Sequence, residues 1–359
     1  MDGGVNQFSF EGFDRQSRDK VEHLLGVLNE IASEPYLARR LCLHGGTAIN
    51  LFALNAPRLS VDIDLNYIGS TDRQTMLKER VELEDALQDI CSSAGYHVSA
   101  GGAEHSGRSF HLGYNGVLGR DQVKIDIDYL NRSPLLPPQP RTVRVAGGVS
   151  ATFPVMADTE LFAGKTKALL ERVAVRDLYD ISQIAKTTPS TVSPDGEAVL
   201  MRNVLLYYTV VAKPFPRPPK IASRFSGREA EMRSQLYPML IPDDRPRLND
   251  LIATAEEYLA EISTPVNQAG KEFVDLAADG EFRPDLLFSE HPDVLRAALN
   301  DPAAQWKMKN LANSTFASTP HRAISQSARD AHGPVWVAPH VRNGKKVDGY
   351  WRRGPQRYA

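Results

Sequence analysis

Residues 41–68, LCLHGGTAINLFALNAPRLSVDIDLNYI, hold the pattern around which the rest of the chain is organised. A short apolar run ends at Gly45-Gly46-Thr47, and apolar residues at helical spacing then predict about two turns of helix. Apolar and polar residues alternate over residues 60–68, which is the period-2 signature of a strand. This alternation places Asp62 and Asp64 on the same face of the strand.

Two like carboxylates that project together need a countercharge. Mg²⁺ is the usual one, because it prefers one or two carboxylates, water and phosphate oxygens. The glycines of the preceding turn let backbone N–H groups approach a phosphate closely, and the hydroxyl of Thr47 can cap a helix or bind a phosphate oxygen. For Asp-x-Asp taken alone, an exposed acidic strand face remains the alternative.

A second strand with an acidic face is predicted over residues 122–130, where Asp126 and Asp128 alternate with apolar residues. Two such strands in one domain favour a shared site over an exposed sheet face. If three carboxylates met there without a metal, mutual repulsion would raise the pKa of at least one of them. Metal affinity is therefore expected to rise with pH.

The chain, with 359 residues and 42% hydrophobic content, is long enough for two domains. About five strands and two or three helices predict an α+β domain with a mixed sheet, followed by a proline-rich connector and two short strand-like runs. Helical spacing dominates after Asp158. We therefore predict three parts, which are residues 1–155, a helical domain 156–313 that completes the active-site cleft, and a basic tail 314–359.

Composition limits the location and the cysteine chemistry. No apolar run reaches the roughly 18 residues of a membrane-spanning helix, and the N-terminus lacks a basic region followed by an apolar core. We therefore expect a soluble cytoplasmic protein with no membrane partner. Cys42 and Cys91 lie in apolar patterns, which favours buried thiols over a disulfide or a metal pair. The net charge of −2 neither demands nor excludes nucleic acid.

A lysine and two aspartates follow in residues 160–181, ELFAGKTKALLERVAVRDLYDI. Lys165 shares a helical stripe with packed apolar residues, and its amine can reach a cleft, where a flexible point charge suits a nucleotide phosphate. Asp177 and Asp180 are three residues apart and share one face of a helix. Asp177 could instead cap that helix or pair with a nearby arginine.

The tail has a positive charge excess, since residues 314–359 hold eight Lys or Arg and two Asp. Asn343-Gly344 between β-favouring runs predicts a hairpin. Basic residues interleaved with Trp336, Tyr350 and Trp351 could grip RNA phosphates and stack unpaired bases. A docking element for a partner protein or a disordered tail is an equally good interpretation.

HGGTAINLF followed by RLSVDIDL resembles the hGG[ST]…RxSxDxD signature of the AbiEii-type abortive-infection toxins. These toxins are type IV toxin–antitoxin nucleotidyltransferases of the DNA polymerase β-like superfamily. The block 160–181 resembles their E-L-x-x-x-K…R-x-x-x-R-D-x-x-D segment. The resemblance covers roughly residues 40–310 and does not cover the tail.

The resemblance implies a polymerase β-like fold, an NTP in the interdomain cleft and two Mg²⁺ ions during catalysis. The implied metal ligands are Asp62, Asp64 and Asp126, with Asp128 as the reserve for the third carboxylate. The same three aspartates, Lys165 and Asp180 form the implied catalytic set. The implied nucleotide-binding residues are Gly45, Gly46, Thr47, Arg58, Ser60 and Lys165.

The family also implies a toxin with a separate antitoxin protein. Some members add nucleotides to the 3′ end of tRNA, so tRNA is the favoured acceptor. Transfer to a protein or small-molecule hydroxyl is the first alternative, and an inactive nucleotide-binding module is the second. No feature of the sequence selects among ATP, GTP, CTP and UTP.

Overall fold

The computed structural model describes residues 5–102, 104, 106–187, 196–212 and 220–318, together with four strand segments, 335–337, 340–342, 345–347 and 350–352. The chain divides into two compact units, Met1–Ala312 and Asn313–Ala359. No helix within the described residues is long and apolar enough to cross a membrane.

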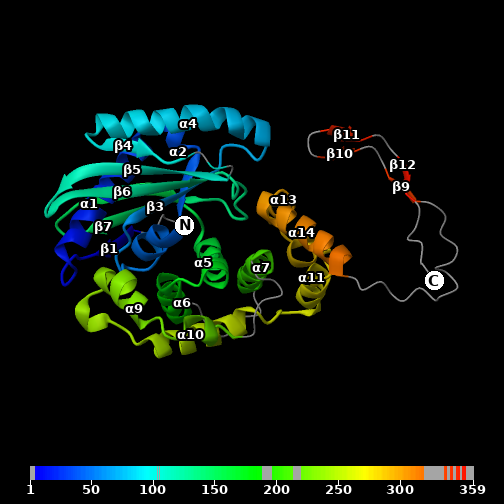
Figure 1. Cartoon of the computed structure of the whole chain (residues 1–359). Coiled ribbons are helices and arrows are strands. Elements are labelled where there is room, and N and C mark those ends of the chain that lie inside the picture. Colours follow the sequence, from blue (N-terminus) through cyan, green and yellow to red (C-terminus); the bar gives the residue numbers. More distant parts are fainter. Residues whose placement is uncertain are drawn as a thin grey trace, which may run out of the picture. The chain divides into compact units, whose positions relative to one another are not determined.

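Eight strands in the described part of the first unit form one mixed sheet (Figure 1). Their order is β1-β7-β8-β2-β3-β6-β5-β4, and the pairs β1–β7, β2–β8 and β3–β6 are parallel. Their bounds are β1 Val5–Phe8, β2 Leu41–His44, β3 Asp62–Tyr67, β4 His97–Ala100, β5 Gly107–Gly116, β6 Gly119–Asp128, β7 Gln139–Val145 and β8 Ser150–Val155.

One face of the sheet is apolar and packs against the helices α1 (Arg15–Ser33) and α4 (Arg73–Ser93), which also contact each other. Asp14 caps the start of α1 by accepting a 3.0 Å hydrogen bond from the backbone N–H of Ser17. The odd-numbered residues of β3 and the matching residues of β6 are fully buried on this face. Burial of such Leu and Ile side chains contributes about 1.5–3 kcal/mol each. The alternate residues of the same strands are therefore directed to the opposite face.

Helices follow β8 for the rest of the first unit, and Figure 1 shows α5, α6 and α7 on the side of the sheet opposite α4. The long helices are α5 Asp158–Arg172, α6 Val175–Thr187, α7 Gly196–Val211, α10 Leu248–Ile262, α11 Gln268–Ala278, α13 Pro292–Leu299 and α14 Pro302–Ser318. The short helical turns are α2 Pro35–Ala38, α3 Gly45–Thr47, η1 Ala48–Ala53, α8 Ala222–Phe225, α9 Glu229–Glu231, η2 Met232–Leu236, η3 Tyr237–Met239, η4 Pro242–Asp244 and α12 Asp285–Phe288.

The predicted α+β class, with a mixed sheet and a helical C-terminal part, is confirmed. The prediction of about five strands was too low. β7 and β8, expected only as short runs, join the sheet through the β2–β8 pair, and β1 pairs with β7 more than 130 residues further along the chain. A pairing over such a sequence distance leaves no local pattern. Cys42 and Cys91 are buried free thiols, as predicted.

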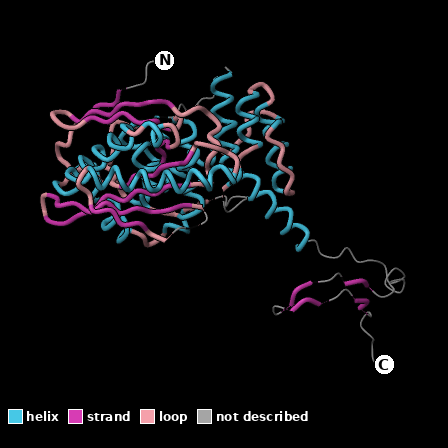
Figure 2. Tube along the Cα trace, turned by 90° about the horizontal axis from the view of Figure 1, so that it is seen from above, coloured by secondary structure: helices cyan, strands magenta, loops and turns pink. Residues whose placement is uncertain are grey.

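The second unit contains four short strands, drawn in magenta near the C-terminus in Figure 2. They are β9 Val335–Val337, β10 His340–Arg342, β11 Lys345–Val347 and β12 Tyr350–Arg352. β10 and β11 pair antiparallel with Arg342 opposite Lys345, on either side of the predicted hairpin turn. Asn343 and Gly344 themselves lie outside the described residues.

Candidate active site

A row of polar residues crosses four neighbouring strands on the face opposite α1 and α4. The strand register sets His44 of β2 beside Asp64 of β3, Asp64 beside Asp126 of β6, and Asp126 beside Ser109 of β5. Directly opposed residues on paired strands share one face. The register therefore brings two of the predicted carboxylates together although they lie far apart in the sequence.

Asp62 lies on the same face, one step along β3, opposite Lys124. We call Asp62, Asp64 and Asp126 the carboxylate row. Lys124 donates a 2.7 Å hydrogen bond from Nζ to Oδ2 of Asp126, and Nη1 of Arg176 lies 3.6 Å from Oδ2 of Asp62. Asp64 has no ion-pair partner in the part of the chain that the structure describes. Three carboxylates thus meet two cations, and the row keeps a net negative charge.

The structure separates the roles of the two aspartates on β6. Asp126 faces the row, and the hydroxyl of Ser109 donates a 2.5 Å hydrogen bond to its Oδ1. Asp128 ends the strand, where its carboxylate accepts hydrogen bonds from the backbone N–H of Leu130 at 2.6 Å and from the amide of Asn131. Asp128 is thus engaged in a turn, and Asp126 is the neighbour of Asp64.

The glycine turn after β2 packs directly on the carboxylate row. Gly45 has a φ of +72°, and a Cβ at this position would lie 2.0 Å from Oδ2 of Asp64. A Cβ on Gly46 would lie 3.0 Å from Oγ of Ser60. No side chain fits at Gly45, and its absence lets the backbone of the turn pack directly against the carboxylate of Asp64.

Thr47 and Ser60, both expected to bind nucleotide, are buried. The hydroxyl of Thr47 donates a 2.5 Å hydrogen bond to the backbone carbonyl of Asp62, at the start of β3. Ser60 lies two residues before Asp62, against Gly46. Both side chains therefore tie the glycine turn to the strand that carries the first two aspartates.

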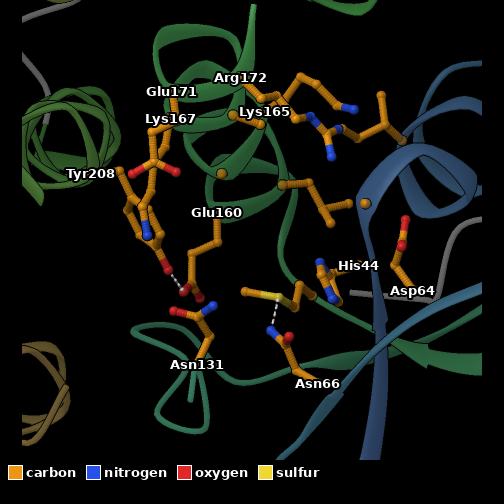
Figure 3. A pocket seen from close by; sticks show the side chains of 16 residues that line it. His44, Asp64, Asn66, Asn131, Glu160, Lys165, Lys167, Glu171, Arg172 and Tyr208 are labelled. Carbon is orange, nitrogen blue, oxygen red and sulfur yellow. Dashed lines mark hydrogen bonds between the residues drawn. The ribbon is translucent and has the colours of Figure 1, made fainter. Parts of the chain in front are cut away.

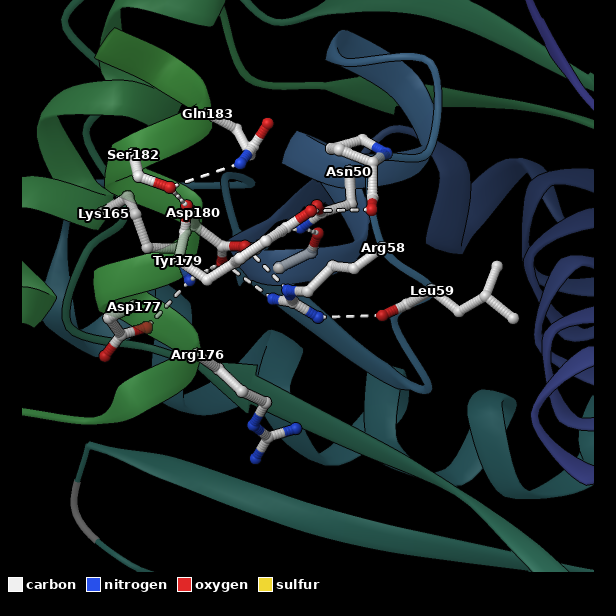
Figure 4. Close-up of polar contacts among 12 residues, drawn as sticks. Asn50, Arg58, Leu59, Lys165, Arg176, Asp177, Tyr179, Asp180, Ser182 and Gln183 are labelled. Carbon is white, nitrogen blue, oxygen red and sulfur yellow. Dashed lines mark hydrogen bonds and ion pairs between the residues drawn. The ribbon is translucent and has the colours of Figure 1, made fainter. Parts of the chain in front are cut away.

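Four charged side chains behind this turn form what we call the buried ion network, which consists of Arg58, Lys165, Asp177 and Asp180 (Figure 4). Arg58 donates two 2.7 Å hydrogen bonds, from Nε and Nη2, to the two oxygens of Asp180. Nζ of Lys165 lies 2.9 Å from Oδ2 of Asp180 and 3.0 Å from Oδ1 of Asp177. All four side chains are less than 5% exposed. The network joins the loop before β3 to α5 and α6.

The cations keep the buried carboxylates ionised. Burial alone would raise the pKa of Asp180, but the Arg58 guanidinium and the Lys165 ammonium hold the pKa of that carboxyl well below its ordinary value. Burial alone would lower the pKa of Lys165, but Asp180 and Asp177 hold it above its ordinary value. Lys165 therefore keeps a fixed positive charge, paired on both sides.

The network also contacts the glycine turn through Asn50, and a further arginine holds the break between α5 and α6. Nδ2 of Asn50 donates to the carbonyl oxygen of Gly46 at 2.9 Å and to Oδ1 of Asp180 at 3.1 Å. Val173, between the two helices, has a φ of +55°, which is strained for a β-branched residue. The guanidinium of Arg228 donates to the carbonyl oxygen of Val173 and holds this conformation.

A cavity of about 230 Å³ lies between the sheet and α5 (Figure 3). Figure 3 shows Lys165 and Arg172 on one side of it and the amides of Asn66 and Asn131 on the opposite side. The side chain of Arg172 is 64% exposed and donates two hydrogen bonds to Asp177. The lining residues are His44, Gly45, Ile49, Asp64, Asn66, Asn131, Met156, Glu160, Leu161, Gly164, Lys165, Lys167, Ala168, Glu171, Arg172 and Tyr208.

Glu160 forms part of the wall of this cavity and has no ion pair with any residue that the structure describes. Its carboxyl accepts hydrogen bonds from the backbone N–H groups of Leu135 and Leu136, at 2.9 and 2.7 Å, and from the hydroxyl of Tyr208 at 2.7 Å. Burial raises the pKa of Glu160 to about 7, although these three donors oppose the rise. Glu160 thus attaches the proline-rich connector to α5 and α7.

A second cavity, of about 630 Å³, lies on the other side of His44 and Asp64, over β5 and β6. His44 and Asp64 line both cavities. Asp126, Lys124 and Ser109 line the second one. His44 and Asp64 therefore lie at the boundary of two spaces, so that a group in one can meet a group in the other at Asp64.

The carboxylate row fits a hard divalent cation. Carboxylate oxygens are the ligands that Mg²⁺ prefers, and it takes only one or two of them beside water and phosphate oxygens. Within the described residues no group of three His, Cys, Asp or Glu side chains encloses a metal ion by itself. An open site that is completed by the substrate's phosphates agrees with both observations.

The predicted site residues thus fall into two groups. Gly45, Asp64, Asp126 and Lys165 line the cavities, and Asp62 is half-buried beside Asp64. Gly46, Thr47, Arg58, Ser60 and Asp180 are buried beneath the site. The catalytic, metal-binding and nucleotide-binding roles of the residues in both groups stay predictions.

Sequence reasoning missed several polar residues that line the cavities or pair with the row: His44, Asn66, Ser109, Lys124, Asn131, Arg172 and Arg176. Two of them did carry a signal, since Arg172 and Arg176 are the arginines of the block R-x-x-x-R-D. The positions of the other residues at the site depend on strand register and loop packing, which cannot be predicted from a local sequence pattern.

The chain belongs to the nucleotidyl transferase AbiEii toxin family of type IV toxin–antitoxin systems, whose model matches residues 26–322. It is a nucleotidyltransferase, and the resemblance of its motifs to this family is confirmed. No curated protein matches the chain significantly.

Three solved structures are similar to the chain, and the first of them supports the fold. The nucleotidyltransferase toxin MenT4 from Mycobacterium tuberculosis H37Rv is 17% identical, with a TM-score of 0.51 over 80% of this chain and 95% of MenT4. JHP933 from Helicobacter pylori is 15% identical, with a TM-score of 0.36 over 85% of this chain and 97% of JHP933. A putative nucleotidyltransferase from H. pylori is 14% identical, with a TM-score of 0.37 over 84% of this chain and 99% of its own.

Proposed function

We propose that this toxin transfers a nucleotide from an NTP to the 3′ end of tRNA, with two Mg²⁺ ions. The observation that carries the chemistry is the register of β3 and β6, which sets Asp64 beside Asp126, next to a glycine turn and a cavity with basic residues. Carboxylates, a close backbone turn and cations are the parts that phosphoryl transfer uses.

Asp62, Asp64 and Asp126 would hold the metal ions. When bound, the ions activate the attacking hydroxyl and stabilise the leaving pyrophosphate. The chain's own cations would have a second role, since Arg176 and Lys124 could approach phosphate oxygens once Asp62 and Asp126 held a metal. These side chains are 40% and 39% exposed, so such an exchange costs little.

The NTP would lie in the 230 Å³ cavity, with its phosphates between the glycine turn and α5. Gly45 and Gly46 would offer backbone N–H groups. Lys165 would supply a fixed positive charge from the cavity wall, since both aspartates hold it in place. Arg172, being exposed, is the side chain best able to reach a phosphate. In this proposal Arg58, Ser60, Thr47 and Asp180 position the turn.

The acceptor would enter from the second cavity and place its hydroxyl beside Asp64 and Asp126. The excess of Lys and Arg in residues 314–359 favours a nucleic-acid acceptor. A protein or small-molecule hydroxyl remains the alternative, because it would need the same carboxylates. The antitoxin that the type IV system implies is a separate protein partner, and cytoplasmic action is part of the proposal.

Incubation of the protein with each labelled NTP and total cell RNA or protein tests the proposal. We expect label in the tRNA fraction, at the 3′ end, and none with Asp62→Ala. Label in protein or in small molecules would overturn tRNA as the acceptor. Full label transfer or toxicity with Asp62→Ala would overturn the mechanism.

A further inference from the structure

One side chain of the 230 Å³ cavity has a hydrogen-bonding group without a partner. Asn66, 3% exposed, lies two residues after Asp64 on the same face of β3 and lines the cavity. Its Nδ2 donates to Sδ of Met156 at 3.3 Å. Its Oδ1 is buried and has no hydrogen-bond partner among the described residues. A buried acceptor without a donor is costly for the fold, which indicates that a ligand supplies the donor.

The position of Asn66 identifies the part of the ligand that meets it. Lys165 and Arg172 lie on the opposite side of the cavity (Figure 3), where the phosphates of an NTP would be held. The end of the nucleotide away from its phosphates is the base. Asn66 therefore faces the base, on the proposed function that this cavity binds an NTP.

Met156 fixes which group of the amide is presented. The thioether sulfur is a weak acceptor, so it favours Nδ2 on its own side. Rotation of the amide by half a turn would bring Oδ1 against the sulfur. Oδ1 is thus the atom that faces the ligand. A carbonyl group of the base at this point would place two hydrogen-bond acceptors together, whereas an amino group of the base would donate a hydrogen bond to Oδ1.

We propose that Asn66 is a specificity-determining residue that selects a base with an amino group at C4 of a pyrimidine or C6 of a purine, cytosine or adenine, over the counterpart with a carbonyl at that position, uracil or hypoxanthine. Met156 is the positioning residue that orients the amide. A site with a buried polar group discriminates against the analogue that leaves the group unpaired by about tenfold or more.

Binding calorimetry of the full-length protein with Mg²⁺ tests this, with CTP against UTP and ATP against inosine triphosphate as matched pairs. In at least one of the two pairs we expect the nucleotide with the amino group, CTP or ATP, to bind more tightly than its keto counterpart by a factor of about ten or more. Asn66→Leu should reduce that ratio to within about threefold of one, because the oxygen that distinguishes an amino group from a carbonyl is then absent.

Two further variants separate base selection from folding. Asn66→Asp keeps an acceptor oxygen at the same place, so it should keep the amino preference that Asn66→Leu loses. Met156→Leu should lower the preference only in part, because the amide can then rotate. Circular dichroism confirms that each variant is folded.

Equal binding within both pairs, a keto preference, or an unchanged ratio in Asn66→Leu would overturn the role of Asn66. Absence of binding by all four nucleotides would overturn the proposed function itself, and this inference with it. The two failures are therefore distinguishable in the same titration.

Discussion

The carboxylate row and the buried ion network use the same residue types in opposite ways. In the row, Asp62 and Asp126 are each 37% exposed, and their cations are about as exposed. In the network, Asp177 and Asp180 are 1% and 0% exposed. An exposed ion pair exchanges partners at little cost in free energy. Removing one partner of a buried ion pair leaves the other charge buried and uncompensated, which is strongly destabilising. The row can therefore release its cations for a metal and a phosphate, while the network holds the site in shape and keeps the charge of Lys165 fixed at the cavity wall.

Glu160 shows what the cations of the network do. Glu160 and Asp180 are both buried carboxyls that accept several hydrogen bonds. Asp180 has two cations beside it and a lowered pKa, whereas Glu160 forms no ion pair within the described parts of the chain and its pKa rises to about 7. Hydrogen bonds alone thus do not keep a carboxyl ionised here, but neighbouring cations do.

The largest effect on stability is expected from Asp180→Ala. This change leaves Arg58 and Lys165 buried with fewer anions and should lower the free energy of unfolding by about 3–5 kcal/mol. Urea unfolding gives the value. Asp62→Ala is the matched control from the row, and it should change the free energy by less than about 1 kcal/mol. Equal losses in both variants would remove the distinction between the two regions.

The next effect concerns the pH dependence of stability through Glu160. Its folded pKa of about 7 lies above the ordinary value of 4.5, so the folded state binds this proton more tightly than the unfolded chain does. The resulting stabilisation is fully present below pH 4.5 and is lost as pH rises through 7, by about 3 kcal/mol in total. Urea unfolding between pH 5 and 8 should therefore show that the free energy of unfolding decreases as pH rises, and that this decrease is smaller in Glu160→Gln. Parallel curves for the two proteins would refute the shift.

The next prediction compares the loss of kcat/KM on substitution of the two aspartates of β6. Asp126→Asn should lower kcat/KM about a hundredfold, because Asp126 lies beside Asp64. Asp128→Asn should lower it less than about threefold, since Asp128 accepts hydrogen bonds in a turn. Steady-state transfer of labelled nucleotide measures both. If Asp128→Asn lowered kcat/KM more than Asp126→Asn did, the third carboxylate of the site would be Asp128 and not Asp126.

The smallest effect on stability is expected from Arg176→Ala. Its 3.6 Å contact with Asp62 joins two half-exposed groups, so its loss should change the free energy of unfolding by less than about 1 kcal/mol. Thermal and urea unfolding provide the check. A loss of several kcal/mol would show that this pair is structural, like those of the network.

Much of the fold could be predicted from local patterns. The alternation in residues 60–68 and 122–130 predicts both acidic strands, and the Gly-Gly-Thr sequence predicts the turn, whereas its contact with Asp64 depends on the packing of the turn on β3. The burial of Asp180 and Lys165 could not be predicted, because it depends on α5 and α6 packing against the loop that carries Arg58. The roles of Lys124 and Asn66 depend on register and on Met156, which lies 90 residues away from Asn66 in the sequence. The division of the first unit at residue 155 stays a prediction.

The central claim is that the carboxylate row performs the chemistry and the buried ion network maintains the fold. Measuring label transfer from NTP and the free energy of unfolding for Asp64→Asn and Asp180→Asn tests it most directly. We predict that Asp64→Asn abolishes transfer with stability within about 1 kcal/mol of the native chain, and that Asp180→Asn loses several kcal/mol of stability. Retained transfer in Asp64→Asn, or native stability in Asp180→Asn, would contradict the claim.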